Sequence, residues 1–416
     1  MKKLVFKDIP YILKQKKYST IEFVLIFPCQ YNKSNIFYFP LLRQLLLNTS
    51  KKFNTEEKYR KAYQENMIIS ETLKISNYNN NTFLTFGLLV PNPKKVKNYD
   101  LESAFKFFTD TIYKPNIINN KFDQDCFNRE KEYLKENILN STKNIHNKSY
   151  QNFINIVDDK GVLNDNIYNN MNLIEESNNE ELYNVYNKYI VNNKPIIIVY
   201  GDVDESINNM IQKYIKIENK EISFVKDYDN YLIPFKKKKN IEEKSKYNQS
   251  FLYIAYKIEN KKKKDDIYLK IITKILGSQP NDLVFKKLRN ELGLVYSVKT
   301  WCNSKVGLLV IETYTNNNSK EEVLMGIESI FEELKDKTLL NNYIQKVIEC
   351  MKYNLIRSKD SRVKKINDFI AKKLKTKYTT EELIKKYENI DLDELLKFID
   401  RLKQDTIYFL RGDFDE

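Results

Sequence analysis

The stretch F-K-K-L-R-N-E-L-G-L-V-Y-S-V, residues 285–298, predicts a corner where a helix turns into a strand. Apolar residues up to Leu288 recur at helical spacing, and beyond Gly293 they alternate as in a strand. A glycine just past a helix end accepts the left-handed conformation that closes the last turn. The corner therefore places Arg289 before the glycine and Tyr296 after it.

Both side chains also have an ordinary structural explanation. An arginine in the last turn of a helix offsets the negative end of the helix dipole. A tyrosine is among the residues that strands favour. The pair on its own therefore does not establish a binding site.

The sequence repeats itself at a distance of about half its length. Residues 195–205 read P-I-I-I-V-Y-G-D-V-D-E, and residues 406–416 read T-I-Y-F-L-R-G-D-F-D-E. An amphipathic helix with an acidic start is predicted before each copy, over residues 180–189 and 393–402. Two copies at this spacing indicate a duplicated domain rather than a solenoid.

The length and local patterns predict two domains of the α+β class. At 416 residues the chain is too long for one typical core. We place an N-terminal domain at 1–226, a polar, lysine-rich linker at 227–248 and a C-terminal domain at 249–416. Each domain is predicted to hold a largely antiparallel sheet packed with helices. The predicted strands include residues 20–29, 82–90, 249–258 and 307–315.

Charge and cysteine content argue against several classes of function, and polyanion binding stays only as a third hypothesis. The net charge is +14, but the lysines are spread along the chain apart from runs at 236–239 and 261–264. No nucleic-acid-binding motif accompanies these runs, so we expect no nucleic-acid partner. The four cysteines lie far apart with no C-x-x-C, which predicts neither a disulfide framework nor a cysteine metal site. The first residues resemble neither a signal peptide nor a membrane span, so we expect a cytoplasmic protein.

A wider stretch around the corner carries a family resemblance. Residues 276–298, L-G-S-Q-P-N-D-L-V-F-K-K-L-R-N-E-L-G-L-V-Y-S-V, resemble the C-terminal-domain signature of the insulinase/pitrilysin zinc peptidases, the inverted zincins. That signature is a small-residue turn, then R-L-F, then R-E-x-x-G-L-x-Y. V-N-N-K-P-I-I-I-V-Y-G-D-V-D at 191–204 and S-K-Y-N-Q-S-F-L-Y-I-A-Y at 245–256 also look like family landmarks. The resemblance covers nearly the whole chain and implies one half of a clamshell-shaped peptidase.

The zinc ligands of that family are missing. Its members need H-x-x-E-H on a helix and a distal glutamate. This sequence has one histidine, His146, which we interpret as a surface residue. On the family pattern, P-L-L-R-Q-L-L-L-N-T-S at 40–50 puts Pro40 and Gln44 at the two histidines and Arg43 at the glutamate.

The distal ligand is missing as well. F-D-Q-D-C-F-N-R-E-K-E-Y-L-K-E-N-I at 122–138 resembles the helix that supplies it and puts Asn137 at the ligand position, or Glu136 if the register differs by one. A cation and neutral amides cannot replace an activating base and imidazoles. We therefore expect no metal in this chain, and no hydrolysis by this chain alone.

Two functions follow from the resemblance. The first is a non-catalytic, substrate-binding subunit of a bacterial heterodimeric zinc metalloendopeptidase that cleaves peptides, including precursor or leader peptides. A homologous H-x-x-E-H partner would hold the zinc, while Arg289 binds substrate carbonyls and Tyr296 donates a hydrogen bond near the scissile carbonyl. The alternative is a non-proteolytic scaffold or binding protein of the same fold, in which the two residues are inherited packing.

Overall fold

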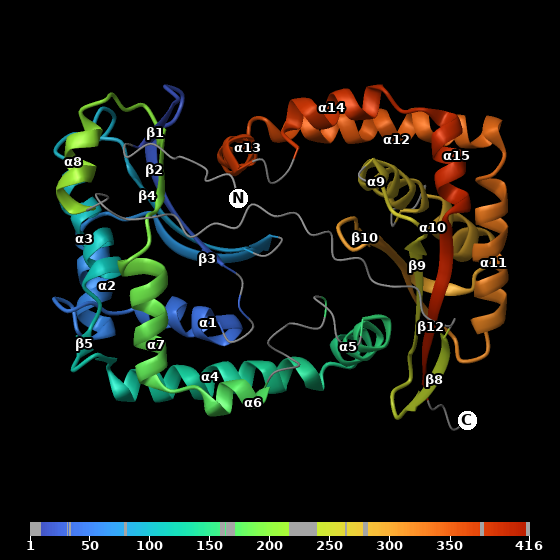
Figure 1. Cartoon of the computed structure of the whole chain (residues 1–416), viewed down its shortest axis with the longest axis horizontal. Helices are drawn as coiled ribbons and strands as arrows, with labels where there is room; N and C mark the ends of the chain where they lie inside the picture. Colours follow the sequence, from blue (N-terminus) through green and yellow to red (C-terminus); the bar gives the residue numbers. More distant parts are fainter. Residues whose placement is uncertain are drawn as a thin grey trace. The chain divides into compact units, whose positions relative to one another are not determined.

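The computed structural model describes residues 10–30, 32, 35–78, 81–158, 163, 171–215, 239–262, 264–277, 282–374 and 378–412. The chain forms two compact units (Figure 1). Unit 1 comprises Met1–Asn140 with Asp165–Asp229, and unit 2 comprises Ser141–Asn164 with Asn230–Glu416. Each unit holds one five-stranded sheet and its own helices.

The sheet of unit 1 has the strand order β1-β7-β2-β4-β3. Its neighbouring strands are antiparallel, except that β1 and β7 are parallel. The strands are β1 Tyr11–Lys14, β2 Thr20–Gln30, β3 Ser70–Tyr78, β4 Asn81–Pro91 and β7 Ile196–Gly201. A small hairpin adds β5 Ile117–Ile118 and β6 Lys121–Phe122. The helices are α1 Asn35–Leu46, α2 Glu56–Glu65, α3 Leu101–Tyr113, α4 Gln124–Lys143, α6 Met171–Glu176, α7 Asn179–Tyr186, a π-helix Asn187–Val191 and α8 Ile207–Tyr214.

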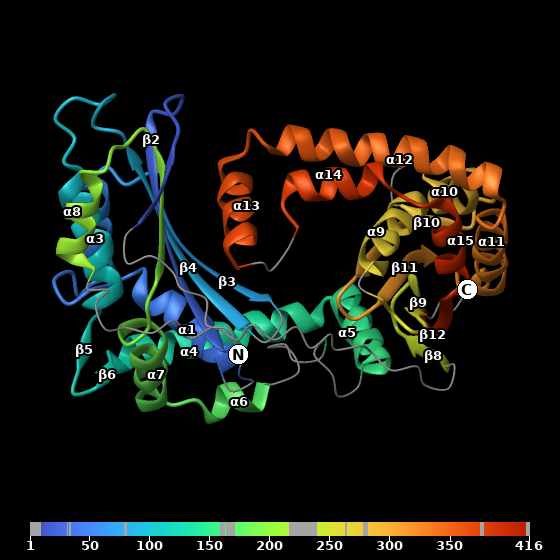
Figure 2. The ribbon, with the colours of Figure 1, turned by 45° about the horizontal axis from the view of Figure 1, so that its top comes forward.

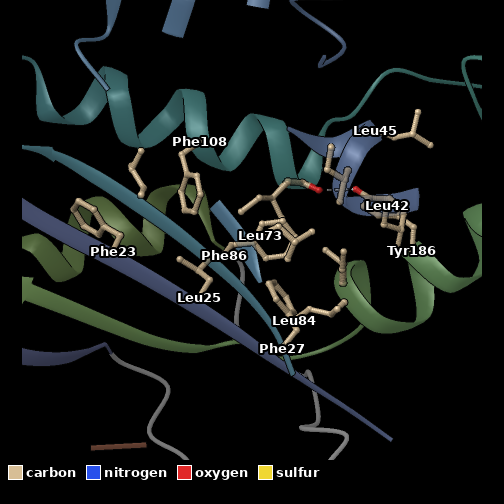
Figure 3. Packing of buried hydrophobic residues seen from close by; sticks show 14 of the residues in the cluster. Phe23, Leu25, Phe27, Leu42, Leu45, Leu73, Leu84, Phe86, Phe108 and Tyr186 are labelled. Atoms are coloured by element: carbon tan, nitrogen blue, oxygen red, sulfur yellow. Dashed lines mark hydrogen bonds between the residues drawn. The ribbon is translucent and has the colours of Figure 1, made fainter. Parts of the chain in front are cut away.

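The core of unit 1 forms between its helices and one face of its sheet (Figure 3). Alternate residues of β2, including Phe23 and Phe27, point to this face because strand side chains alternate. The rings of Phe23 and Phe105 of α3 have centroids 4.7 Å apart, and those of Phe27 and Phe86 of β4 are 5.7 Å apart. These aromatic contacts join α3 to the middle of the sheet.

The sheet of unit 2 has the order β10-β11-β9-β12-β8. It is antiparallel except for the parallel pair of β12 and β8. The strands are β8 Lys239–Ser245, β9 Ser250–Ile258, β10 Val295–Asn303, β11 Leu308–Thr315 and β12 Leu402–Gly412. The helices are α5 Ile145–Val157, α9 Asp265–Leu276, α10 Leu283–Phe285, a π-helix Lys286–Glu291, α11 Lys320–Glu333, α12 Lys337–Ser358, α13 Arg362–Leu374, α14 Thr380–Glu388 and α15 Leu392–Asp400.

The two sheets have the same topology, which confirms the duplicated α+β architecture. Reading β8-β12-β9-β11-β10 against β1-β7-β2-β4-β3 matches each strand by its place in the chain and in the sheet. The repeated sequences form β7 and β12, and each pairs in parallel with the first strand of its unit. Residues 413–416, the end of the second copy, lie outside the described residues.

The boundaries of the units differ from those predicted. Residues 239–245, predicted as linker, form β8. This strand reads K-N-I-E-E-K-S and is mostly exposed at the edge of its sheet, so its composition resembles a linker. Residues 227–238 lie outside the described residues.

The second difference is α5, which belongs to unit 2 although its sequence lies within the predicted first domain. In Figure 2, α5 lies on the opposite side of the second sheet from α11 and α15. Its Phe153 stacks on Tyr253 of β9 with ring centroids 4.9 Å apart. Both faces of this sheet therefore carry an apolar cluster, one under α5 and one under α9, α11, α12 and α15.

Candidate functional site

The predicted helix-to-strand corner is present in unit 2. Gly293 has a φ of +64°, the left-handed conformation expected there. The N–H of Leu292 donates to the carbonyl of Lys287 at 3.1 Å, and the N–H of Leu294 donates to that of Leu288 at 2.8 Å. The helix before the glycine is a π-helix rather than an α-helix. Single π-helical turns are frequent at functional sites.

Arg289 lies in this π-helix with its side chain exposed. Its Nη1 donates a hydrogen bond to the carbonyl of Val295 at 2.8 Å, across the corner. In the described part of the chain it forms no ion pair. One N–H of the guanidinium thus fixes the side chain while the group keeps its charge.

Tyr296 lies at a β-bulge in β10. The register with β11 shifts between Val295, opposite Thr315, and Ser297, opposite Tyr314. Bulges turn a side chain away from the regular pleat and are common beside active sites. Tyr296 is 58% exposed, and its hydroxyl donates to Oδ1 of Asn316 at 2.7 Å. The corner therefore presents an exposed cation and an exposed phenol.

The positions predicted for a lost metal site lie on α1 and α4. Pro40, Arg43 and Gln44 share one face of α1 because they are spaced by three and four residues. Arg43 is exposed, and Pro40 and Gln44 are half-buried. Asn137 is exposed on α4. Residues of these types offer a metal no imidazole or carboxylate, so they do not fit zinc.

The structure brings only two of these four residues together in one cavity. Arg43 and Gln44 line a cavity of about 200 Å³ with Arg60 of α2 and Glu71 of β3, and neither Pro40 nor Asn137 contributes to it. Among the described residues, no group of three or more histidine, cysteine, aspartate or glutamate side chains could hold a metal ion.

Glu71 is a candidate residue that the sequence analysis missed. The hydroxyl of the buried Tyr59 donates to its Oε2, and its Oε1 is buried with no hydrogen-bond partner in the described structure. Burial raises the pKa of Glu71 to about 8, although the bond from Tyr59 opposes this effect. Acidic residues are frequent in this sequence, so no local signal distinguishes this one.

His146, predicted as a surface residue, is 34% exposed but also contacts a buried carboxylate. It lies on α5, and its Nε2 is 2.6 Å from Oε1 of Glu312, whose side chain is 2% exposed. Nζ of Lys299 lies 3.7 Å from the other oxygen of Glu312. The sequence could not show this contact because α5 joins a sheet formed much later in the chain.

The comparisons with known proteins agree with this architecture. A family described as "Peptidase M16 inactive domain" matches residues 177–346. The chain is 20% identical to a "Probable inactive metalloprotease YmfF" of Bacillus subtilis over 408 residues, covering 97% of this chain and 95% of that protein.

Solved structures show the same fold. A conserved protein from Enterococcus faecalis V583 matches with a TM-score of 0.82 and 20% identity over 97% of this chain and 96% of that one. A protease from Helicobacter pylori matches with a TM-score of 0.75 and 14% identity over 98% of both chains. No helix among the described residues has the length and apolar character needed to span a membrane.

Proposed function

Because the chain belongs to the insulinase/pitrilysin (peptidase M16) family as an inactive member, we propose that it is the substrate-binding subunit of a two-chain zinc metalloendopeptidase. Its own sequence has no H-x-x-E-H. The zinc would therefore belong to a homologous partner chain that keeps this motif. The substrates would be peptides, including precursors from which a leader is removed, and the pair would act in the bacterial cytoplasm.

The observation that carries this proposal is the pair of exposed side chains at the corner. Arg289 and Tyr296 lie on either side of Gly293, and hydrogen bonds across the turn fix the backbone between them. A guanidinium has five N–H donors, and the bond to Val295 uses one. Arg289 would bind a substrate carbonyl, and the hydroxyl of Tyr296 would exchange Asn316 for the oxygen on which negative charge develops.

The first test is peptide cleavage by the two chains purified together, with Arg289→Ala in this chain. We expect turnover to fall about 10²–10³-fold if the side chain stabilises developing charge. Lys286→Ala is the matched control, because Lys286 is an exposed cation of the same π-helix. Its turnover should stay within about twofold of the unaltered pair, since a weak surface ion pair contributes little.

Unchanged turnover with Arg289→Ala would exclude the proposed role of this residue. Stoichiometric zinc in the purified single chain, together with cleavage that a chelator abolishes, would contradict the two-chain proposal itself. A thermal melt of each variant separates loss of function from loss of fold.

A scaffold of the same fold is the second candidate, and one observation favours it. Arg289 and Tyr296 both have hydrogen-bond partners within their own unit, Val295 and Asn316. In a scaffold these bonds are the whole role of the two residues. Arg289→Ala would then lower stability and leave cleavage by any co-purified peptidase unchanged.

A further inference from the structure

The cavity between α1, α2 and β3 has features that the proposed function does not use. It holds about 200 Å³, and guanidinium, amide and carboxyl groups from three elements line it. The polar groups of this cavity belong to Arg43, Gln44, Asn48, Arg60, Tyr63 and Glu71. A concave site with a few convergent polar groups is the usual form of a small-ligand site.

The guanidinium groups give the cavity positive charge. Nη2 of Arg60 donates to Oδ1 of Asn48 at 3.2 Å and lies 3.6 Å from Glu56, an exposed residue in the same helix. Asn48 in turn donates to the carbonyl of Gln44 at 2.7 Å. Arg43 forms no ion pair within the described residues. The ion pair of Arg60 with Glu56 is long and exposed, so it engages this arginine weakly.

Glu71 provides a buried polar atom that lacks a partner. Its Oε1 has no hydrogen bond in the described structure, whereas Oε2 accepts one from Tyr59. A buried carboxyl oxygen without a hydrogen bond costs free energy, which a ligand group that reached it from the cavity would recover. Because burial raises the pKa of Glu71 to about 8, the carboxyl carries a proton at neutral pH and can donate it in a hydrogen bond.

We propose that this cavity binds a carboxylate, either the C-terminus of a peptide or a free small acid, between Arg43, Arg60 and the carboxyl of Glu71. One oxygen of the ligand accepts from a guanidinium, and the other accepts the Glu71 proton. This site requires no metal and no partner chain, so it stands independently of the proposed peptidase role.

The test is calorimetric titration of the full chain at pH 7 with N-acetyl-trialanine, its C-terminal amide, and acetate. We expect saturable binding of the acid peptide and at least tenfold weaker binding of the amide. If acetate binds as tightly as the acid peptide, the ligand is a free small acid. If only the acid peptide binds, the ligand is a peptide C-terminus.

Two variants locate the site. Arg43→Gln should weaken carboxylate binding about tenfold, which corresponds to the loss of one charge-assisted hydrogen bond. Arg129→Gln is the control, because Arg129 is an exposed arginine of unit 1 that lies outside the cavity. No saturable binding of either carboxylate, or equal affinity in the Arg43→Gln chain, would overturn the proposal.

The pH dependence gives an independent readout. The groups around Glu71 are Tyr59, Arg60, Tyr63 and Arg43, and burial raises the pKa of both tyrosines further from neutrality. Carboxylate affinity should therefore fall from pH 7 to pH 9 as Glu71 loses its proton. Glu71→Gln keeps a donor that does not ionise, so its affinity should stay level over this range. The same pH dependence in both chains would contradict the assigned role of Glu71.

Discussion

Glu71 shows how burial sets the chemistry of a single residue in this protein. Its carboxyl lies in β3, bonded to Tyr59 on one oxygen only. Burial raises its pKa from 4.5 to about 8. Between these two values the unfolded chain releases a proton that the folded chain keeps. The stability associated with Glu71 is therefore fully present below pH 4.5 and is lost as the pH rises to about 8.

Glu71→Gln should remove this loss. Relative to the unaltered chain, we expect the variant to gain unfolding free energy between pH 4.5 and pH 8, on the order of 1.4 kcal/mol for each pH unit between the two pKa values. Urea unfolding at several pH values measures this difference. Glu65→Gln is the control, since Glu65 is exposed in α2. A constant difference across the pH range would show that Glu71 ionises normally.

Among single residues, the sequence identifies some members of the candidate sites but not others. Gly293 is identifiable because only a few residues tolerate a left-handed helix end. Arg289 and Tyr296 depend on a family resemblance, since their types are ordinary for a helix and a strand. Glu71 and His146 depend on contacts with residues of other elements, Tyr59 and Glu312, which no local pattern encodes.

Among the elements, the corner between the π-helix and β10 depends on the backbone conformation of a single residue, Gly293. Gly293 takes a positive φ, and a Cβ built on it would meet no atom within 4 Å. Substitution there therefore acts through backbone conformation rather than through a clash. The hydroxyl of Thr315 donates to the carbonyl of Leu294 at 2.6 Å and joins the corner to β11. Strain at the glycine would be transmitted to the strand that carries Tyr296.

Gly293→Ala should destabilise the chain by about 1 kcal/mol, because a Cβ disfavours this conformation. In the two-chain cleavage assay it should also lower turnover, since the corner orients Arg289 and Tyr296. Gly293→Asn should have the smaller effect on both, because asparagine tolerates positive φ. Thermal unfolding and cleavage rates check the prediction. Equal effects of alanine and asparagine would show that the backbone conformation is not the cause.

Strands with a strong local signal were predicted well, and two edge strands with polar sequences were not. β2 and β4 lie within one residue of their predicted ends because they are apolar and buried. β3 and β8 were missed, since they are edge strands with polar composition. An edge strand needs only one neighbour and one buried face, so its sequence carries a weaker pattern.

For the whole molecule, the duplicated topology is the property that the sequence revealed most directly. The repeated strands β7 and β12 occupy equivalent positions in the two sheets. The exception to a division of the sequence into two consecutive domains is α5, which covers the second face of the later sheet. Its apolar residues follow the same helical pattern whichever sheet they cover. The sequence analysis predicted no helix over residues 145–157, and a helical pattern alone would not have shown which sheet the helix covers.

The single tryptophan, Trp301 of β10, reports on this docking of α5, since its ring lies 5.9 Å from that of Tyr150. Phe153→Ala removes a fully buried ring from the same cluster and should cost about 3–5 kcal/mol. The urea concentration at the unfolding midpoint, followed by tryptophan fluorescence, should be lower in this variant. The emission of the folded variant should also shift to the red, because loosening of α5 admits water to the indole. Asn155→Ala, an exposed position of the same helix, should change neither. An unchanged midpoint for Phe153→Ala would mean that the stability of unit 2 does not depend on α5. The domain boundary predicted near residue 226 would then describe the stability of the chain better than a boundary that assigns α5 to unit 2.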